Sequence, residues 1–65
     1  MSKEEELNEL YNIYADAIEG SCMAICMGVN VEENRQGNAR NSAKIAEIRA
    51  EADRLGIKLE RRRAY

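Results

Sequence analysis

Few side chains in this 65-residue chain are suited to catalysis or metal binding, and the absent residue types exclude most sites of either kind. The sequence contains no His, which removes the commonest general base, the usual partner of a nucleophilic Ser or Cys, and most zinc ligand sets. Its many carboxylates fall on predicted helical surface, where they are solvated rather than paired as acid and base. Gly37-Asn38 lacks the Lys and the spacing of a phosphate-binding loop. We therefore expect no enzyme, no catalytic residue and no cofactor.

Cys22 and Cys26 are the only cysteines, and their spacing places them side by side on one helix face. Small secreted domains held by disulfides normally carry four or more cysteines. The favoured interpretation is two buried, reduced thiols that pack as small apolar side chains, with no metal bound. The alternatives are a redox or metal pair, for which a homodimer would supply four thiolates, and a disulfide between subunits.

The most basic part of the chain is its C-terminal end, where Arg61, Arg62 and Arg63 lie close to Tyr65. Arginines neutralise phosphates and a tyrosine ring stacks on a base, so this group suits contact with nucleic acid or an acidic partner. The N-terminal half carries one Lys and eight acids, whereas the C-terminal half carries nine Lys or Arg and four acids. In an antiparallel hairpin the two ends meet, so mutual neutralisation with the first acids is the favoured interpretation. Those acids are Glu4, Glu5, Glu6 and Glu9.

A long N-terminal helix is predicted over about residues 3–28. Ser2 is a favoured N-cap, and Glu5 three residues later completes a capping box. Apolar or small residues then recur in alternating steps of three and four, which is a heptad seam. These positions are Leu7, Leu10, Tyr14, Ala17, Ser21, Ala24 and Gly28. The small residues come last, and small side chains allow another helix to approach closely.

Residues 22–29 are apolar on nearly every side of this helix, because Met23, Cys26 and Met27 lie away from the seam. A helix of this kind is buried from several directions, and one other helix cannot cover it. We therefore expect a homodimer, or burial against a different protein. The residues expected at the self-association surface and in the core it completes are Ala17, Gly20, Ser21, Ala24, Ile25, Gly28, Ile45, Ile48, Ala52 and Leu55.

A second helix is predicted over about residues 39–55, ending at a Schellman motif in which Gly56 takes a positive φ and Ile57 folds back. Two connections fit the sequence: a turn near residues 28–30, or a loop to about residue 38. If the second helix reaches further back, three asparagines join its seam, and a buried Asn can fix register and oligomer state. The favoured interpretation makes them loop and cap residues. They are Asn34, Asn38 and Asn41.

Residues 57–61 alternate apolar and charged side chains, which is the period of a strand. So short a segment cannot form a sheet alone. We favour an extended tail over residues 57–65, with Ile57 and Leu59 packed on the hairpin. The alternatives are pairing with the same segment of a second chain, or addition to the sheet edge of a partner.

These patterns predict an all-α fold, a two-helix antiparallel hairpin with a short extended C-terminal tail, assembled as a homodimeric helical bundle. The acidic start lacks the features of a secretory signal, and the longest apolar run, residues 21–29, is shorter than the ~20 residues of a membrane span. We therefore expect a cytoplasmic protein without membrane contact.

The expected function is a small non-enzymatic protein that binds another protein, as an inhibitor, anti-defence factor or adaptor. The alternative is a small nucleic-acid-binding regulator that uses the basic C-terminal half. In size and architecture only, the chain resembles small regulators of plasmid and phage origin, and this likeness transfers no residue.

Overall fold

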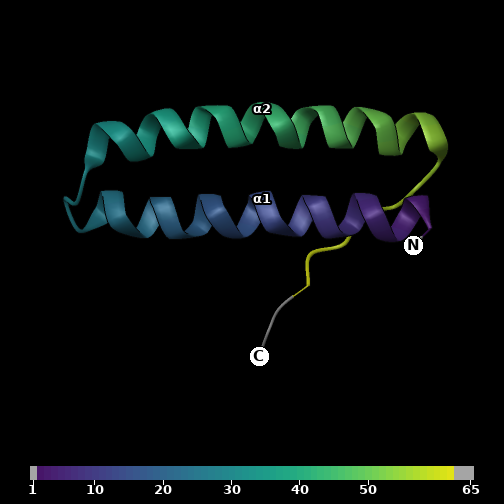
Figure 1. Cartoon of the computed structure of the whole chain (residues 1–65), viewed down its shortest axis with the longest axis horizontal. Helices are drawn as coiled ribbons and strands as arrows, with labels where there is room; N and C mark the ends of the chain where they lie inside the picture. The colour runs from purple at the N-terminus through teal and green to yellow at the C-terminus, as the bar shows by residue number, and fades with distance from the viewer. Residues whose placement is uncertain (1, 63–65) are drawn as a thin grey trace.

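The computed structural model describes residues 2–62, which form two helices and a tail. Helix α1 spans Lys3–Cys26 and helix α2 spans Val31–Leu55. The two helices lie antiparallel along the long axis of the molecule (Figure 1), and the tail, residues 57–62, passes from the end of α2 to α1. The structure confirms the all-α class and the packing of the two helices against each other, with no strand among the described residues.

The start of α1 follows the local sequence. Ser2 has extended backbone angles, φ −73° and ψ 162°, and its hydroxyl accepts a hydrogen bond from the Glu5 N–H at 3.2 Å. Three acids occupy the first turn, where the positive end of the helix dipole favours negative charge. The prediction that Ser2 is the N-cap is therefore confirmed.

Helix α1 ends at Cys26, just before the predicted residue 28, because Gly28 takes a left-handed conformation with φ 74°. The Gly28 N–H donates to the Ile25 carbonyl at 3.0 Å, and the Val29 N–H donates to the Ala24 carbonyl at 2.9 Å. This pair of bonds is a Schellman motif, which satisfies carbonyls left open at the end of the helix. Gly28 thus belongs to the turn and not to a helix contact.

Helix α2 begins at Val31, so the predicted start near residue 39 was wrong and the alternative of a turn near residues 28–30 is the observed one. Asn30 is also left-handed, with φ 44°, a conformation that Asn tolerates better than most residues. Two left-handed residues so close together reverse the chain within a short turn. The Asn34 side chain then donates to the Val29 and Asn30 carbonyls at 2.9 and 3.0 Å, which fastens the turn to the first turn of α2.

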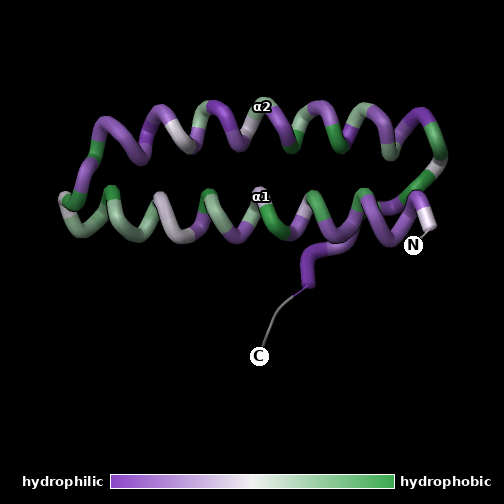
Figure 2. Tube along the Cα trace, viewed as in Figure 1, coloured by the Kyte–Doolittle hydropathy of each residue, from purple (hydrophilic) through white to green (hydrophobic). Residues whose placement is uncertain are grey.

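The interpretation of Asn34, Asn38 and Asn41 as loop and cap residues was also wrong. All three lie within α2 and are half-buried. Gly37 interrupts this stretch, but a Gly inside a helix costs only about 1 kcal/mol relative to Ala. The surrounding Glu, Arg, Gln and Ala residues favour the helix, and no Pro stops it. The turn half of α2 is therefore hydrophilic, whereas the half of α1 that faces it is neutral to hydrophobic (Figure 2).

The buried core lies at the end of the hairpin away from the turn. Leu7, Ile48 and Ala52 are buried, and Leu10, Tyr11, Tyr14, Ile57 and Leu59 pack against them. Leu55 was predicted in this core, but 43% of it is exposed. The 3.0 Å ion pair between Lys3 and Glu51 shows the reason, because it places the first residue of α1 one turn before Leu55. Leu55 therefore extends past the start of its partner helix.

The end of α2 is the predicted Schellman motif. Gly56 has φ 70°, its N–H donates to the Asp53 carbonyl at 3.2 Å, and the Ile57 N–H donates to the Ala52 carbonyl at 2.8 Å. This geometry matches the pattern expected from the order Leu-Gly-Ile. It turns the chain back toward α1 at the point where the tail begins.

Asn38 offers a test of the polar half of the helix interface, because its Oδ1 is buried and has no hydrogen-bond partner. A buried acceptor without a partner costs about 1–3 kcal/mol. Replacing Asn38→Leu is therefore expected to raise the free energy of unfolding by about 1 kcal/mol, measured by urea denaturation. The control is Asn41→Leu, a half-buried Asn that has no such unpartnered atom. A lower urea midpoint for Asn38→Leu than for wild type would contradict the assignment.

Candidate protein-interaction site

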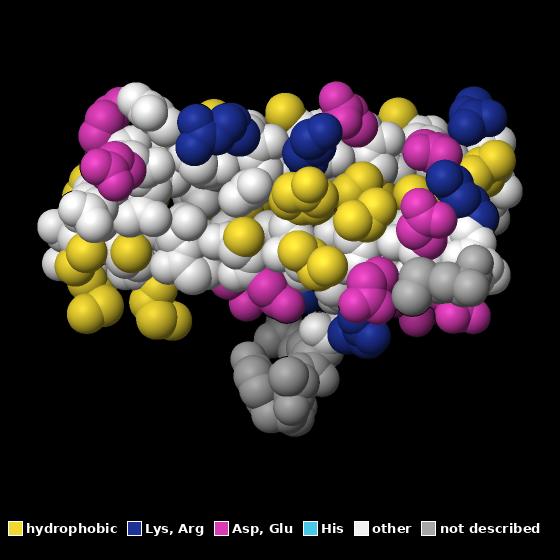
Figure 3. All heavy atoms as spheres, viewed as in Figure 1, with side chains coloured by type: hydrophobic (Ala, Val, Ile, Leu, Met, Phe, Trp, Pro, Cys, Tyr) yellow, Lys and Arg dark blue, Asp and Glu magenta, His cyan; other side chains and the backbone are white. Residues whose placement is uncertain are grey.

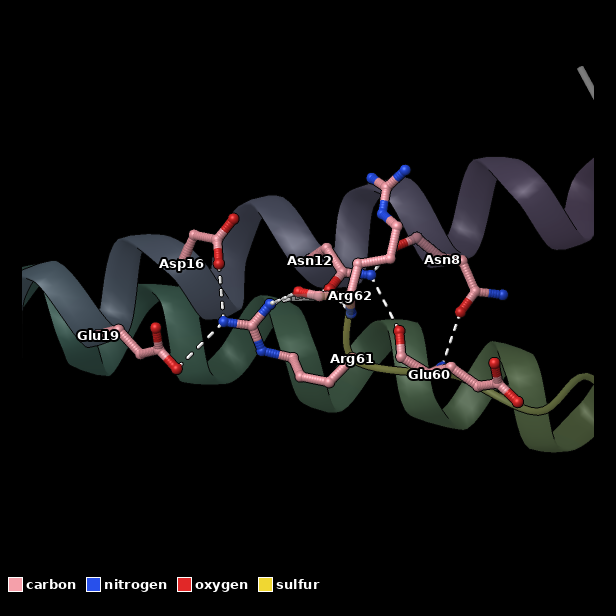
Figure 4. Close-up of polar contacts among 7 residues, drawn as sticks. All are labelled: Asn8, Asn12, Asp16, Glu19, Glu60, Arg61 and Arg62. Carbon is pink, nitrogen blue, oxygen red and sulfur yellow. Dashed lines mark hydrogen bonds and ion pairs between the residues drawn. The ribbon is translucent and has the colours of Figure 1, made fainter. Parts of the chain in front are cut away.

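The tail is held on α1 by the side chains of two asparagines (Figure 4). Asn8 Oδ1 accepts from the Glu60 N–H at 2.8 Å, and Asn8 Nδ2 donates to the Lys58 carbonyl at 3.5 Å. Asn12 Oδ1 accepts from the Arg62 N–H at 2.7 Å, and Asn12 Nδ2 donates to the Glu60 carbonyl at 3.0 Å. Each carboxamide thus binds the N–H of one tail residue and the carbonyl two residues earlier, as a neighbouring strand would.

The spacing of Asn8 and Asn12 explains this match. Residues four apart on an α-helix share a face and are separated by about 6 Å along its axis. Two residues of extended chain advance by about 6.6 Å. An Asn pair at this helical spacing can therefore pair with every second residue of an extended segment. Sequence reasoning missed both residues; the available signal was this Asn pair on a helix together with the alternating pattern of the tail.

Arg61 extends this contact further along α1. Its Nη1 donates to Asn12 Oδ1 at 2.8 Å, while its Nη2 lies 2.7 Å from Asp16 Oδ1 and 3.2 Å from Glu19 Oε1. The hydrogen bond with Asp16 is the main reason that the pKa of Arg61 is raised above its ordinary value. We call Asn8, Asn12, Asp16 and Glu19 the tail clamp. It fixes both the backbone of the tail and one of its charged side chains.

The tail turns its alternate side chains in opposite directions. Ile57 and Leu59 are half-buried and pack against the core, whereas Lys58 and Glu60 are exposed. Arg61 continues the inner row by pairing with the acids of the tail clamp. The tail thus combines apolar contacts, backbone hydrogen bonds and an ion pair within six residues.

The charged groups proposed for nucleic-acid contact are placed differently from the expectation. Arg61 pairs with Asp16 and Glu19, in the middle of α1. Arg62 Nη2 lies 3.7 Å from Glu9 Oε2. In the described part of the chain, no ion pair joins either arginine to the three acids of the first turn. Arg63 and Tyr65 lie outside the described residues. Acids of α1 therefore form ion pairs with two of the three consecutive arginines, Arg61 and Arg62.

Three of the five basic residues of α2 also have partners. Arg49 donates from Nη2 to the Tyr11 hydroxyl at 3.3 Å, and its guanidinium lies 5.5 Å from the centroid of the Tyr11 ring. Lys44 Nζ lies 3.7 Å from Glu47 Oε2, and Arg54 Nη2 lies 3.7 Å from Glu51 Oε1. At these three positions the positive charge of α2 lies beside an acid or a tyrosine.

A different kind of surface lies at the turn end of the hairpin. Met23, Met27 and Val29 are 67%, 73% and 49% exposed. Met27 is the C-cap residue of α1, four residues after Met23, and Val29 follows in the turn. Apolar side chains gather at this end of α1 in Figure 3. We call these three residues the turn-end patch.

The residues predicted to form the self-association surface fall into three groups. Ile48 and Ala52 are buried within the hairpin, so they serve its own core. Four residues are half-buried, namely Ser21, Ala24, Ile25 and Ile45. Four are exposed, namely Ala17, Gly20, Gly28 and Leu55. At Gly20 an added Cβ would meet no atom within 4 Å, so no tight backbone contact is made there in the single chain.

Cys22 and Cys26 are both exposed free thiols, so their interpretation as buried side chains was wrong. The helix that faces them is polar, with Asn38 opposite Cys22 at 3.6 Å between Nδ2 and Sγ. A polar residue beside the thiols leaves them at the edge of the helix interface instead of inside an apolar core. The part of the chain that the structure describes contains no group of three or more His, Cys, Asp or Glu arranged to hold a metal.

Neither α1 nor α2 is long and apolar enough to cross a bilayer.

Comparison of the chain with models of protein families, with curated proteins and with solved structures finds no match.

Proposed function

We propose that this chain is a small non-enzymatic protein that binds another protein through its turn-end patch, as an inhibitor or adaptor. The exposure of Met23 and Met27 carries the proposal, because a chain with a small buried core leaves two of its largest apolar side chains in solvent. Methionine adapts its shape to a partner, and adjoining exposed apolar residues mark interaction sites. A cytoplasmic location stays a prediction from the sequence.

The test uses the full chain as bait in its host, with two double variants. Met23→Glu with Met27→Glu adds two charges to the patch, whereas Ala43→Glu with Ala50→Glu adds two charges to exposed positions of α2. We expect proteins captured by wild type and by the α2 variant to be reduced at least tenfold with the patch variant. Equal capture by all three baits would contradict the proposal.

The same experiment distinguishes the nucleic-acid alternative. Binding carried by phosphate contacts falls steeply as salt rises and is abolished by nuclease treatment. We expect capture through the turn-end patch to withstand both, because its contacts are apolar. Capture that is lost with nuclease but unaffected by the two Glu substitutions in the patch would favour a nucleic-acid regulator instead.

We further propose that a homodimer forms through the exposed face of α1 that contains Ile13, Ala17 and Gly20. These residues follow helical spacing, and small side chains let two helices approach closely. A two-fold axis would place the same face on both chains. Ala17→Glu should convert the dimer to a monomer in light scattering while the helical circular dichroism persists. A wild-type monomer at micromolar concentration would disprove this assembly.

A further inference from the structure

The two thiols of α1 form a pair that the proposed function does not use. Cys22 and Cys26 are four residues apart in one regular helix, so their Cβ atoms are about 5–6 Å apart on the same face. Both side chains are exposed and carry free thiols. Two sulfur ligands can therefore point at one ion without any change in the backbone.

The number and type of these ligands select the class of metal. Zinc in proteins takes four nitrogen, sulfur or oxygen ligands, and no third His, Cys, Asp or Glu joins the pair among residues 2–62. Calcium and magnesium require oxygen ligands, which the pair does not offer. Thiolate sulfur selects Cu(I), a soft ion for which two thiolates are a sufficient ligand set. The pair therefore fits a monovalent soft metal better than a divalent one.

One neighbouring side chain is suited to a thiolate ligand. Asn38 approaches from α2, with its Nδ2 3.6 Å from Cys22 Sγ. An amide N–H beside sulfur stabilises the negative charge of a thiolate ligand.

We propose that Cys22 and Cys26 bind one Cu(I) ion per chain as two thiolate ligands. Two thiols lose their protons as two sulfur–copper bonds form. Copper stays in the +1 state, so no electron is transferred. The site lies within one helix and needs neither a partner protein nor a second copy of the chain.

The test is an anaerobic titration of the reduced full chain with Cu(I), in competition with the chromogenic chelator bathocuproine disulfonate. Wild type is expected to withdraw one Cu(I) per chain from the chelator. Cys22→Ser and Cys26→Ser should each weaken binding at least 100-fold, with unchanged helical circular dichroism. Ala43→Ser, which adds a hydroxyl at an exposed position of α2, serves as the control and should bind as wild type does.

Two outcomes would overturn the site: Cu(I) binding that persists in the double Cys→Ser variant, or a stoichiometry of one Cu(I) per two chains. The double Cys→Ser variant also separates this site from the turn-end patch. It should lose Cu(I) while its capture of partner proteins matches that of wild type.

Discussion

Replacing Leu7→Ala is expected to remove a large part of the stability of this chain. Leu7 is 2% exposed and belongs to a core of three buried apolar residues. A buried Leu→Ala change costs about 2–5 kcal/mol, and the total stability of a chain this size is about 3–10 kcal/mol. In urea denaturation followed by circular dichroism, we expect the unfolding midpoint to fall to about half its wild-type value or lower.

The matched control is Leu55→Ala, which makes the same chemical change at a side chain that is 43% exposed. Leu55 lies past the start of α1, so its truncation should cost less than about 1 kcal/mol. Equal losses for the two variants would contradict the burial of Leu7 in the core and the exposure of Leu55.

Asn12→Ala is expected to release the tail from α1. Asn12 is 4% exposed, and its side chain bonds the Glu60 carbonyl and the Arg62 N–H. Truncation leaves these groups without partners and also removes the bond to Arg61, for a cost of about 2–3 kcal/mol. The measurement is amide hydrogen exchange, in which Glu60 and Arg62 should lose the protection they have in wild type.

The graded control for this variant is Asn8→Ala. Asn8 is only half-buried, and one of its two bonds to the tail is long, at 3.5 Å. We expect this variant to lose protection at Glu60 and to retain it at Arg62, which Asn12 holds. Wild-type protection at both amides in Asn12→Ala would mean that the tail is not held by the clamp.

Local signals in the sequence were sufficient for the parts of the fold that depend on neighbouring residues. Ser2 caps α1 and Gly56 ends α2, because each acts on backbone groups within a few positions of itself. The heptad spacing of Leu7 and Leu10 likewise indicated the inner face of α1. These features could be predicted before any tertiary contact was known.

Other features depend on where the second helix lies. The exposure of Leu55 follows from where α1 begins, and Cys22 has the polar Asn38 beside it on α2 instead of an apolar side chain. The start of α2 at Val31 depends on two left-handed residues whose combined effect on the chain direction no single propensity describes. Periodicity along one helix cannot supply this information.

The tail clamp was missed for a related reason. Asn8 and Asn12 read as ordinary surface residues of α1, since their function appears only when a segment about 50 residues later lies beside them. The alternation in residues 57–61 indicated an extended tail but not the helix face that receives it. The Asn pair and the alternation of the tail are each visible in the sequence, but nothing in the sequence joins the two segments.

Under the proposed function, another protein covers the turn-end patch. Hydroxyl-radical footprinting of the full chain tests it directly, by comparing oxidation of Met23 and Met27 in host lysate and in buffer. Oxidation is normalised to Leu55, which lies at the opposite end of the hairpin. We predict that both methionines are oxidised several-fold less in the lysate. Equal normalised oxidation in lysate and buffer would contradict the claim.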